Sequence, residues 1–176
     1  MTALAKWSTP ECPFVIEYAP GALEGIRIAV SDAFFSAPRG GAEIGGILLG
    51  KWEPSRLTIS SYRPLDCEHA FGPSFTLSPR DRAQLTELIA SVKSSGEQVT
   101  GWYHSHTRSH IFLSEADQRI HSDFFLEPWQ VALVLRPDTF VPTRAGFFFP
   151  EGSGTFAHRI LLPGVYGRAA RAEAGV

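Results

Sequence analysis

The sequence predicts an α/β fold, more closely an α+β fold, in which a single domain holds a mixed β-sheet flanked by helices. Its length of 176 residues suits one domain with one core. Segments with helical periodicity are interspersed among short apolar segments, and several apolar segments follow one another directly, as the strands of hairpins do. We expect the domain to occupy residues 1–162, and residues 163–176 to form a flexible C-terminal tail.

Seven segments are predicted to be strands, because each is short, apolar or alternating, and bounded by turn residues. They are residues 14–18, 43–52, 56–62, 98–106, 129–137, 145–150 and 155–161. The segment 64–76 is expected to be a loop with some extended chain.

The first predicted helix begins at Pro20, and the Pro-Arg-Gly-Gly turn at residues 38–41 ends it. Its apolar residues recur at spacings of three and four and therefore share one face: Leu23, Ile26, Val30 and Phe34.

Two further helices are predicted to begin with a serine that is followed three residues later by an aspartate, the pattern of a capping box. In the second helix Ser78 caps the first turn, Pro79 takes the first helical position, and Gly96 ends the helix. Its apolar stripe is Leu85, Leu88, Ile89 and Val92. The third helix is expected to run from Ser114 to before Pro128, and its buried side is expected to hold Ala116, Ile120 and Phe124.

Composition excludes several classes of function. The net charge is −2, from 16 basic and 18 acidic residues, so we expect no nucleic-acid partner. Apolar runs such as Val131–Leu135 are too short to cross a membrane, and the N-terminus lacks the apolar core of a signal peptide. Cys12 and Cys67 stand outside any C-x-x-C pair. We therefore expect a cytoplasmic protein with two reduced thiols, although a disulfide between them stays open.

The stretch GWYHSHTRSHIFLSEADQ, residues 101–118, contains the residue types of a metal site. Because successive side chains of a strand point to opposite faces, His104 and His106 share a face and can converge on one point. Asp117 lies in the first turn of the next helix, which the intervening loop is long enough to fold back over the strand. Two histidines and one carboxylate form a three-ligand set that leaves one position open, as in catalytic zinc sites.

Each of these features also has an explanation without chemistry. Ser114 and Asp117 match a capping box, which needs no metal. His110 has no paired spacing and is expected to be solvated or to face a substrate, and Glu115 is expected to be exposed. We assign no chemistry to the remaining histidines: His69, His121 and His158.

Taken together, the residues resemble the JAMM (MPN-plus, or JAB) family of zinc metalloproteases, of the compact prokaryotic type. The spacing from His104 to Asp117 matches the family's His-x-His-x7-Ser-x2-Asp signature. Glu43, at the head of the apolar strand EIGGILLG, resembles the family's upstream glutamate. The resemblance spans about residues 14–160 and implies a JAB/MPN-like, cytidine-deaminase-like architecture. Thr107 departs from the pattern, since many members carry proline there; we expect this to affect only the rigidity of the loop.

The resemblance implies a role for each matching position. His104, His106 and Asp117 are expected to hold one Zn²⁺ per chain. Glu43 is expected to be the acid/base that handles the water at the metal, and Ser114 the hydroxyl that steadies the developing oxyanion.

The resemblance further implies hydrolysis of a peptide or isopeptide bond after the C-terminal tail of a ubiquitin-like or sulfur-carrier protein. Two alternatives stay open: a metal-dependent hydrolase of small amides, and a non-catalytic scaffold like the family's inactive branch. A zinc nucleobase deaminase is disfavoured, because the P-C-x-x-C half of its signature is absent. The oligomeric state and the roles of His110 and Cys67 are left open by the sequence.

Overall fold

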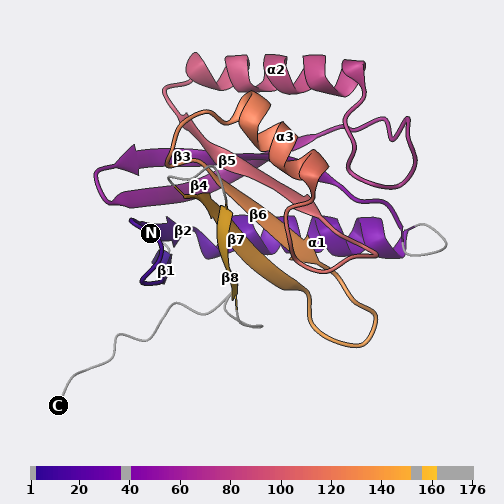
Figure 1. The fold of residues 1–176 in the computed structure, drawn as a ribbon, viewed down its shortest axis with the longest axis horizontal. Coiled ribbons are helices and arrows are strands. Elements are labelled where there is room, and N and C mark those ends of the chain that lie inside the picture. Colours follow the sequence, from indigo (N-terminus) through magenta and orange to yellow (C-terminus); the bar gives the residue numbers. More distant parts are fainter. Residues whose placement is uncertain (1–2, 37–40, 152–155, 162–176) are drawn as a thin grey trace.

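A computed structural model describes residues 3–36 and 41–151, and the backbone of residues 156–161. Its centre is one eight-stranded sheet with the strand order β1-β2-β4-β3-β5-β6-β7-β8 (Figure 1). The strands are β1 (Ala5–Trp7), β2 (Val15–Tyr18), β3 (Gly45–Glu53), β4 (Arg56–Leu65), β5 (Gln98–Ser105), β6 (Val131–Arg136), β7 (Arg144–Pro150) and β8 (Phe156–Leu161). The β2–β4 and β5–β6 pairs are parallel and the other pairs are antiparallel, which confirms the predicted mixed sheet.

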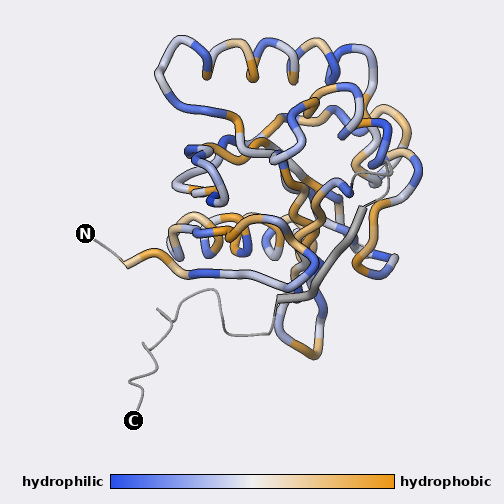
Figure 2. Tube along the Cα trace, turned by 60° about the vertical axis from the view of Figure 1, so that its left-hand side comes forward, coloured by the Kyte–Doolittle hydropathy of each residue, from blue (hydrophilic) through white to orange (hydrophobic). Residues whose placement is uncertain are grey.

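Three helices cover the two faces of this sheet: α1 (Pro20–Phe35), α2 (Pro79–Lys93) and α3 (Glu115–Phe124). Figure 2 shows α1 and α2 on opposite sides of the strands, with hydrophobic residues concentrated where the layers meet. The predicted helix starts are confirmed. Pro20 occupies the first turn of α1, and α2 and α3 both begin with a complete capping box, in which the serine hydroxyl and the aspartate carboxylate each accept a backbone N–H.

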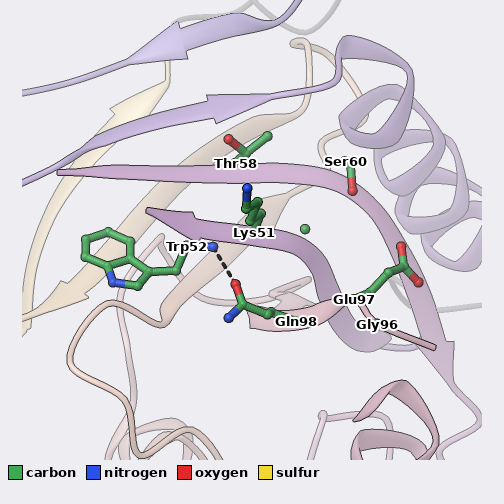
Figure 3. A pocket seen from close by; sticks show the side chains of 8 residues that line it. Lys51, Trp52, Thr58, Ser60, Gly96, Glu97 and Gln98 are labelled. Atoms are coloured by element: carbon green, nitrogen blue, oxygen red, sulfur yellow. Dashed lines mark hydrogen bonds between the residues drawn. The ribbon is translucent and has the colours of Figure 1, made fainter. Parts of the chain in front are cut away.

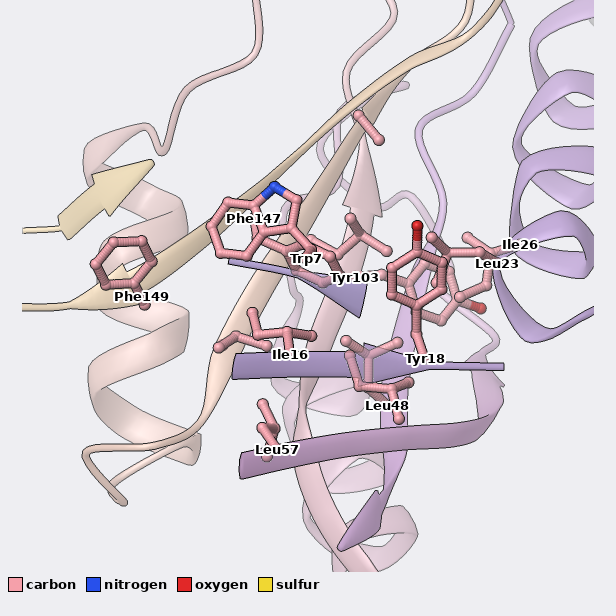
Figure 4. Packing of buried hydrophobic residues seen from close by; sticks show 14 of the residues in the cluster. Trp7, Ile16, Tyr18, Leu23, Ile26, Leu48, Leu57, Tyr103, Phe147 and Phe149 are labelled. Carbon is pink, nitrogen blue, oxygen red and sulfur yellow. The ribbon is translucent and has the colours of Figure 1, made fainter. Parts of the chain in front are cut away.

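Alternation along the strands produces two hydrophobic cores, one on each face of the sheet. The first lies between the sheet and α1, where Leu23 and Ile26 pack with the strand residues Tyr18, Leu48 and Tyr103 (Figure 4). The second lies between the sheet and the α2 and α3 helices. It contains Ile47, Leu49, Leu85, Val92, Trp102, Ile120 and Val134. The side chains of one strand therefore contribute to both cores, as expected for a sheet that is buried on both faces.

The structure differs from the sequence-based prediction in a few places. A short edge strand, β1, precedes the predicted ones, and β4 continues to Leu65. The helix α3 ends at Phe124, before Pro128 as predicted. The prediction that Ala116 is buried is wrong: it is exposed, and Asp117 and His121 are buried instead. The helix is rotated toward Asp117 because that carboxylate faces the strand β5.

Other expectations are confirmed or lie outside the described residues. Cys12 and Cys67 are both buried free thiols, so no disulfide joins them. Burial raises the pKa of Cys67 to about 11, and its thiol donates to Asp81 Oδ2 at 3.3 Å, a structural contact. Among the described residues, no helix has the length and apolar character needed to span a bilayer. The proposed tail at 163–176, most of the turn at 38–41 and the His158 side chain fall outside the described part.

A bulge in β5 sets which of its side chains face α3. The register of β5 against β3 shifts between Gly101 and Val99, so Val99 and Trp102, three residues apart, both lie in the core under α2 and α3. Gly101 has a φ of 149°, and a Cβ there would lie 1.9 Å from the Val131 carbonyl oxygen. The bulge therefore requires glycine, and it directs Trp102 and, two residues later, His104 toward α3.

We predict that Gly101→Ala destabilises the protein by about 1–3 kcal/mol, because the added methyl group has no space and the backbone conformation disfavours a side chain. The measurement is thermal unfolding, with an expected loss of roughly 2–4 °C per kcal/mol. Gly21→Ala is the control: Gly21 is an exposed residue in the first turn of α1, and a Cβ there would meet nothing within 4 Å. An equal effect of both substitutions would contradict this account of the bulge.

Candidate metal centre

Three buried side chains converge between the end of β5 and the start of α3. The Nε2 atoms of His104 and His106 lie 3.0 Å apart. The two carboxylate oxygens of Asp117 lie 3.3 Å from them, Oδ1 from His104 and Oδ2 from His106. All three residues are at most 4% exposed, and among the described residues they form the one group of histidine, cysteine and acidic side chains with the spacing of a metal site.

The strand β5 places the two imidazoles. His106 follows the strand directly, and its backbone N–H donates to the Leu135 carbonyl at 2.9 Å, so the pairing with β6 continues through it. The intervening Ser105 points away from the site, where its hydroxyl accepts the Ile44 N–H at 3.0 Å. The predicted sharing of a face by His104 and His106 is therefore confirmed.

The capping box of α3 places the carboxylate. Asp117 Oδ2 accepts the Ser114 N–H at 2.8 Å, and the Ser114 hydroxyl accepts the Asp117 N–H at 3.1 Å. Burial would raise the pKa of Asp117, but the charge of His104 and hydrogen bonds from both imidazoles and Ser114 hold that pKa far below its usual range. Asp117 is therefore an ionised carboxylate that also starts the helix.

The donor set fits zinc. Nitrogen and oxygen ligands at about 2.0–2.1 Å in a tetrahedron lie about 3.3 Å from one another, close to the separations observed here. His106 Nδ1 lies 2.8 Å from the His110 carbonyl oxygen. Since a carbonyl only accepts, Nδ1 carries a proton, which leaves Nε2 as the ring nitrogen that would bind a metal. His110 thus contributes through its backbone, and its side chain is exposed.

Glu43 lies beside this group, although it is separated from it by more than sixty residues in sequence. Its carboxylate accepts two backbone N–H groups, with Oε1 3.0 Å from Thr107 N and Oε2 3.0 Å from Phe75 N. Burial would lower the pKa of His106, but contacts with Asp117 and His110 and the negative charge of Glu43 raise it. The structure therefore brings all five residues predicted from the sequence, Ser114 included, to one place.

The departure from the family pattern at Thr107 does affect the site, contrary to our expectation that only loop rigidity changes. The Thr107 backbone N–H donates to the Glu43 carboxylate, and proline has no N–H to donate. In this chain the side chain of Glu43 is held by a hydrogen bond that a proline at this position would remove.

Sequence reasoning missed the loop between β4 and α2, residues 66–78, as a part of the site. Pro73 accepts the Glu43 backbone N–H, and His69 Nε2 lies 2.7 Å from the Glu43 carbonyl oxygen. The ring of Phe75 lies over His104, with centroids 5.9 Å apart. No periodicity marks these contacts, because the loop reaches Glu43 through its own irregular path.

A shallow groove elsewhere on the surface is a separate feature. It is lined by residues at the other end of β3, β4 and β5, including Lys51, Thr58, Glu97 and Gln98 (Figure 3). Gln98 is six residues before His104 on β5, which corresponds to about 20 Å of strand. The Gln98 side chain accepts the Trp52 backbone N–H at 2.6 Å, and Lys51 pairs with Glu53 at 3.2 Å, so these polar groups are engaged in local contacts.

The mixed sheet, its flanking helices and the His-His-Asp group define an α/β protein with a candidate metal site. Residues 26–125, more than half of the chain, match the sequence family described as JAB1/Mov34/MPN/PAD-1 ubiquitin protease. The chain therefore belongs to the JAB/MPN family, which includes hydrolases, and the resemblance inferred from the sequence is confirmed.

Solved structures support the same fold. A protein from Desulfitobacterium hafniense is 19% identical, with a TM-score of 0.59 over 82% of this chain and 89% of its own. A protein from Salinibacter ruber is also 19% identical, with a TM-score of 0.52 over 81% of this chain and 87% of its own. Among curated proteins, none matches this chain.

We predict that zinc added to the metal-free protein raises its unfolding temperature, because an ion that binds only the folded state stabilises it, by about 2.7 kcal/mol at one hundred times Kd. Asp117→Asn should remove most of this shift. Asp81→Asn is the matched control, since Asp81 occupies in the α2 capping box the position that Asp117 occupies in the α3 capping box. It should lower stability yet keep the zinc-induced shift; loss of the shift in both variants would argue against Asp117 as a ligand.

Proposed function

We propose that this chain is a zinc-dependent peptidase that cleaves a peptide or isopeptide bond after the C-terminal tail of a ubiquitin-like or sulfur-carrier protein. The single observation that carries this proposal is the convergence of an acid, Glu43, on a buried His-His-Asp group. The inactive members of the family have lost ligands, whereas this chain carries the full set. Membership of a family described as ubiquitin protease favours the substrate class.

The metal would be held by His104, His106 and Asp117. Zinc bound at these ligands supplies a Lewis acid and lowers the pKa of water to about 7. The remaining steps belong to the protein. Glu43 takes the proton of the attacking water and passes it to the leaving amine, a role worth roughly 10²–10⁴ in rate. Its two backbone hydrogen bonds fix the carboxylate while leaving further lone pairs for this proton transfer.

Ser114 has a hydroxyl arranged for a second role. Its oxygen accepts the Asp117 N–H, so its own proton remains free to donate. We propose that this proton stabilises the oxyanion that develops on the scissile carbonyl, while the oxygen continues to cap α3. One side chain thus serves both the helix and the reaction.

We predict that Glu43→Gln retains zinc but lowers turnover by about 10²–10⁴-fold, because the amide cannot accept a proton. The measurement is cleavage of a ubiquitin-like protein fused after its Gly-Gly end, alongside metal analysis. The glutamine NH₂ must face one of the two backbone N–H groups that the carboxylate accepts, so thermal unfolding should also show a loss of stability.

Three outcomes would contradict the proposal in different ways. Full turnover by folded Glu43→Gln would show that the acid/base is misassigned. A wild-type protein that binds less than about half a zinc per chain with excess metal, and cleaves no fusion, would instead favour the non-catalytic scaffold. Cleavage of small amides without cleavage of the fusion would favour the alternative hydrolase.

We predict that Ser114→Ala lowers both stability and turnover, whereas Ser78→Ala lowers stability alone. Both serines accept the N–H of an aspartate three residues later at 3.1 Å. Each loss of a cap should cost about 0.5–2 kcal/mol. Because Ser114→Ala also removes an oxyanion donor, this variant alone should show a further decrease in kcat of about 10²–10³-fold. Unchanged kcat in a folded Ser114→Ala variant would restrict Ser114 to capping.

A further inference from the structure

The two imidazoles of the metal site are oriented in different ways. His106 Nδ1 donates to the His110 carbonyl, which fixes the ring in its plane. His104 is fully buried, yet among the described residues its Nδ1 has no hydrogen-bond partner. Histidine ligands normally depend on such a partner for their tautomer and ring orientation. Another contact must therefore orient His104.

Aromatic stacking provides that contact. The ring of Trp102, two residues earlier on β5, lies 4.4 Å from the ring of His104 with an angle of only 10° between the planes. Phe75 lies over the same ring at 5.9 Å and 21°. Gly45, directly across from His104 on β3, leaves the space for Phe75, because a Cβ there would lie 2.6 Å from that ring.

Trp102 is itself held in place from α3. Its indole Nε1–H donates to His121 Nδ1 at 3.0 Å, and its ring stacks on Phe125 at 5.9 Å and 5°. Burial lowers the pKa of His121 to about 4, so at neutral pH this imidazole is uncharged and its Nδ1 accepts. The hydrogen bond to His121 and the stack on Phe125 together fix the position and the rotation of the Trp102 indole.

The Trp102–His121 pair joins the same two elements as the His104–Asp117 pair. Trp102 and His104 lie on one face of β5, and Asp117 and His121, one helical turn apart, lie on one face of α3. Two contacts therefore join β5 to α3. His104 contacts Asp117 at the candidate metal site, and Trp102, two residues earlier on β5, contacts His121, four residues later on α3.

We propose that Trp102, anchored by His121, is a positioning residue that fixes the plane of the His104 imidazole for metal binding. The inference rests on the metal site of the proposed function and adds two residues that do not touch the metal. Ordinary core packing would also bury Trp102, but it would not require the indole N–H to meet one particular acceptor. The two explanations differ in what the loss of that acceptor does to the metal.

The test is zinc affinity, measured by competition with a chromophoric chelator, together with the visible spectrum of the cobalt-substituted protein. Trp102→Phe and His121→Leu should each raise the Kd for zinc about 10–100-fold and alter the cobalt spectrum. His121→Asn, whose amide oxygen can replace Nδ1 as acceptor, should keep the affinity within about threefold. Trp52→Phe is the matched control, since Trp52 stacks on Trp129 at 5.6 Å and 3°, at the other end of the sheet.

The double variant tests the route of the effect. If His121 acts through Trp102, His121→Leu should change zinc affinity by less than about twofold in the Trp102→Phe background. Wild-type affinity in folded His121→Leu, or an equal loss with and without Trp102, would overturn the proposal. Should His121→Leu not fold, Trp102→Phe decides: wild-type affinity with an unchanged cobalt spectrum would overturn it. A wild-type protein that binds no zinc would refute the proposed function itself.

Discussion

The site depends on the register between β3 and β5. Gly45 pairs with His104, and the ladder continues past the strand end, where the Ser105 N–H donates to the Ile44 carbonyl. The same register brings Glu43 opposite His106, and residues directly opposite each other in an antiparallel pair point to the same face. A shift by one residue would turn Glu43 to the opposite face of the sheet. The register, more than any single contact, makes an acid and two imidazoles neighbours.

The same capping motif occurs twice in this chain, and the two aspartate carboxylates have different partners. Ser78 with Asp81 and Ser114 with Asp117 form capping boxes with nearly equal distances. The carboxylate of the first accepts the Cys67 thiol and the Glu68 N–H, and that of the second meets two imidazoles. Both boxes satisfy helix N–H groups, so capping alone predicts a helix start and nothing more. What lies across from the carboxylate decides whether it also serves as a metal ligand.

This explains how much could be predicted from the sequence. Patterns of short range, such as the alternation that pairs His104 with His106 and the caps of α2 and α3, correctly gave the mixed sheet and its helices. The convergence of Glu43 was predicted through the resemblance to a family, because no local pattern relates residues so far apart. Phe75 and the backbone role of Thr107 were missed, since they depend on the path of irregular loops. Ala116 was placed on the wrong side because the three-to-four spacing allows two adjacent stripes, and the buried polar residues Asp117 and His121 mark the correct one.

The two candidate ligands His104 and His106 connect the site to different parts of the molecule. His106 is oriented by the carbonyl of His110, four residues later in its own loop, so its geometry depends on that irregular stretch of chain. His104 is oriented by a stack that begins at β5, passes through Trp102 and ends on α3, so its geometry depends on the packing of the core. Because α3 also provides Asp117, any displacement of that helix would move this candidate ligand and the aromatic support of His104 together. Binding of a metal and the docking of α3 on the sheet are therefore expected to stabilise each other, since both require the same position of the helix.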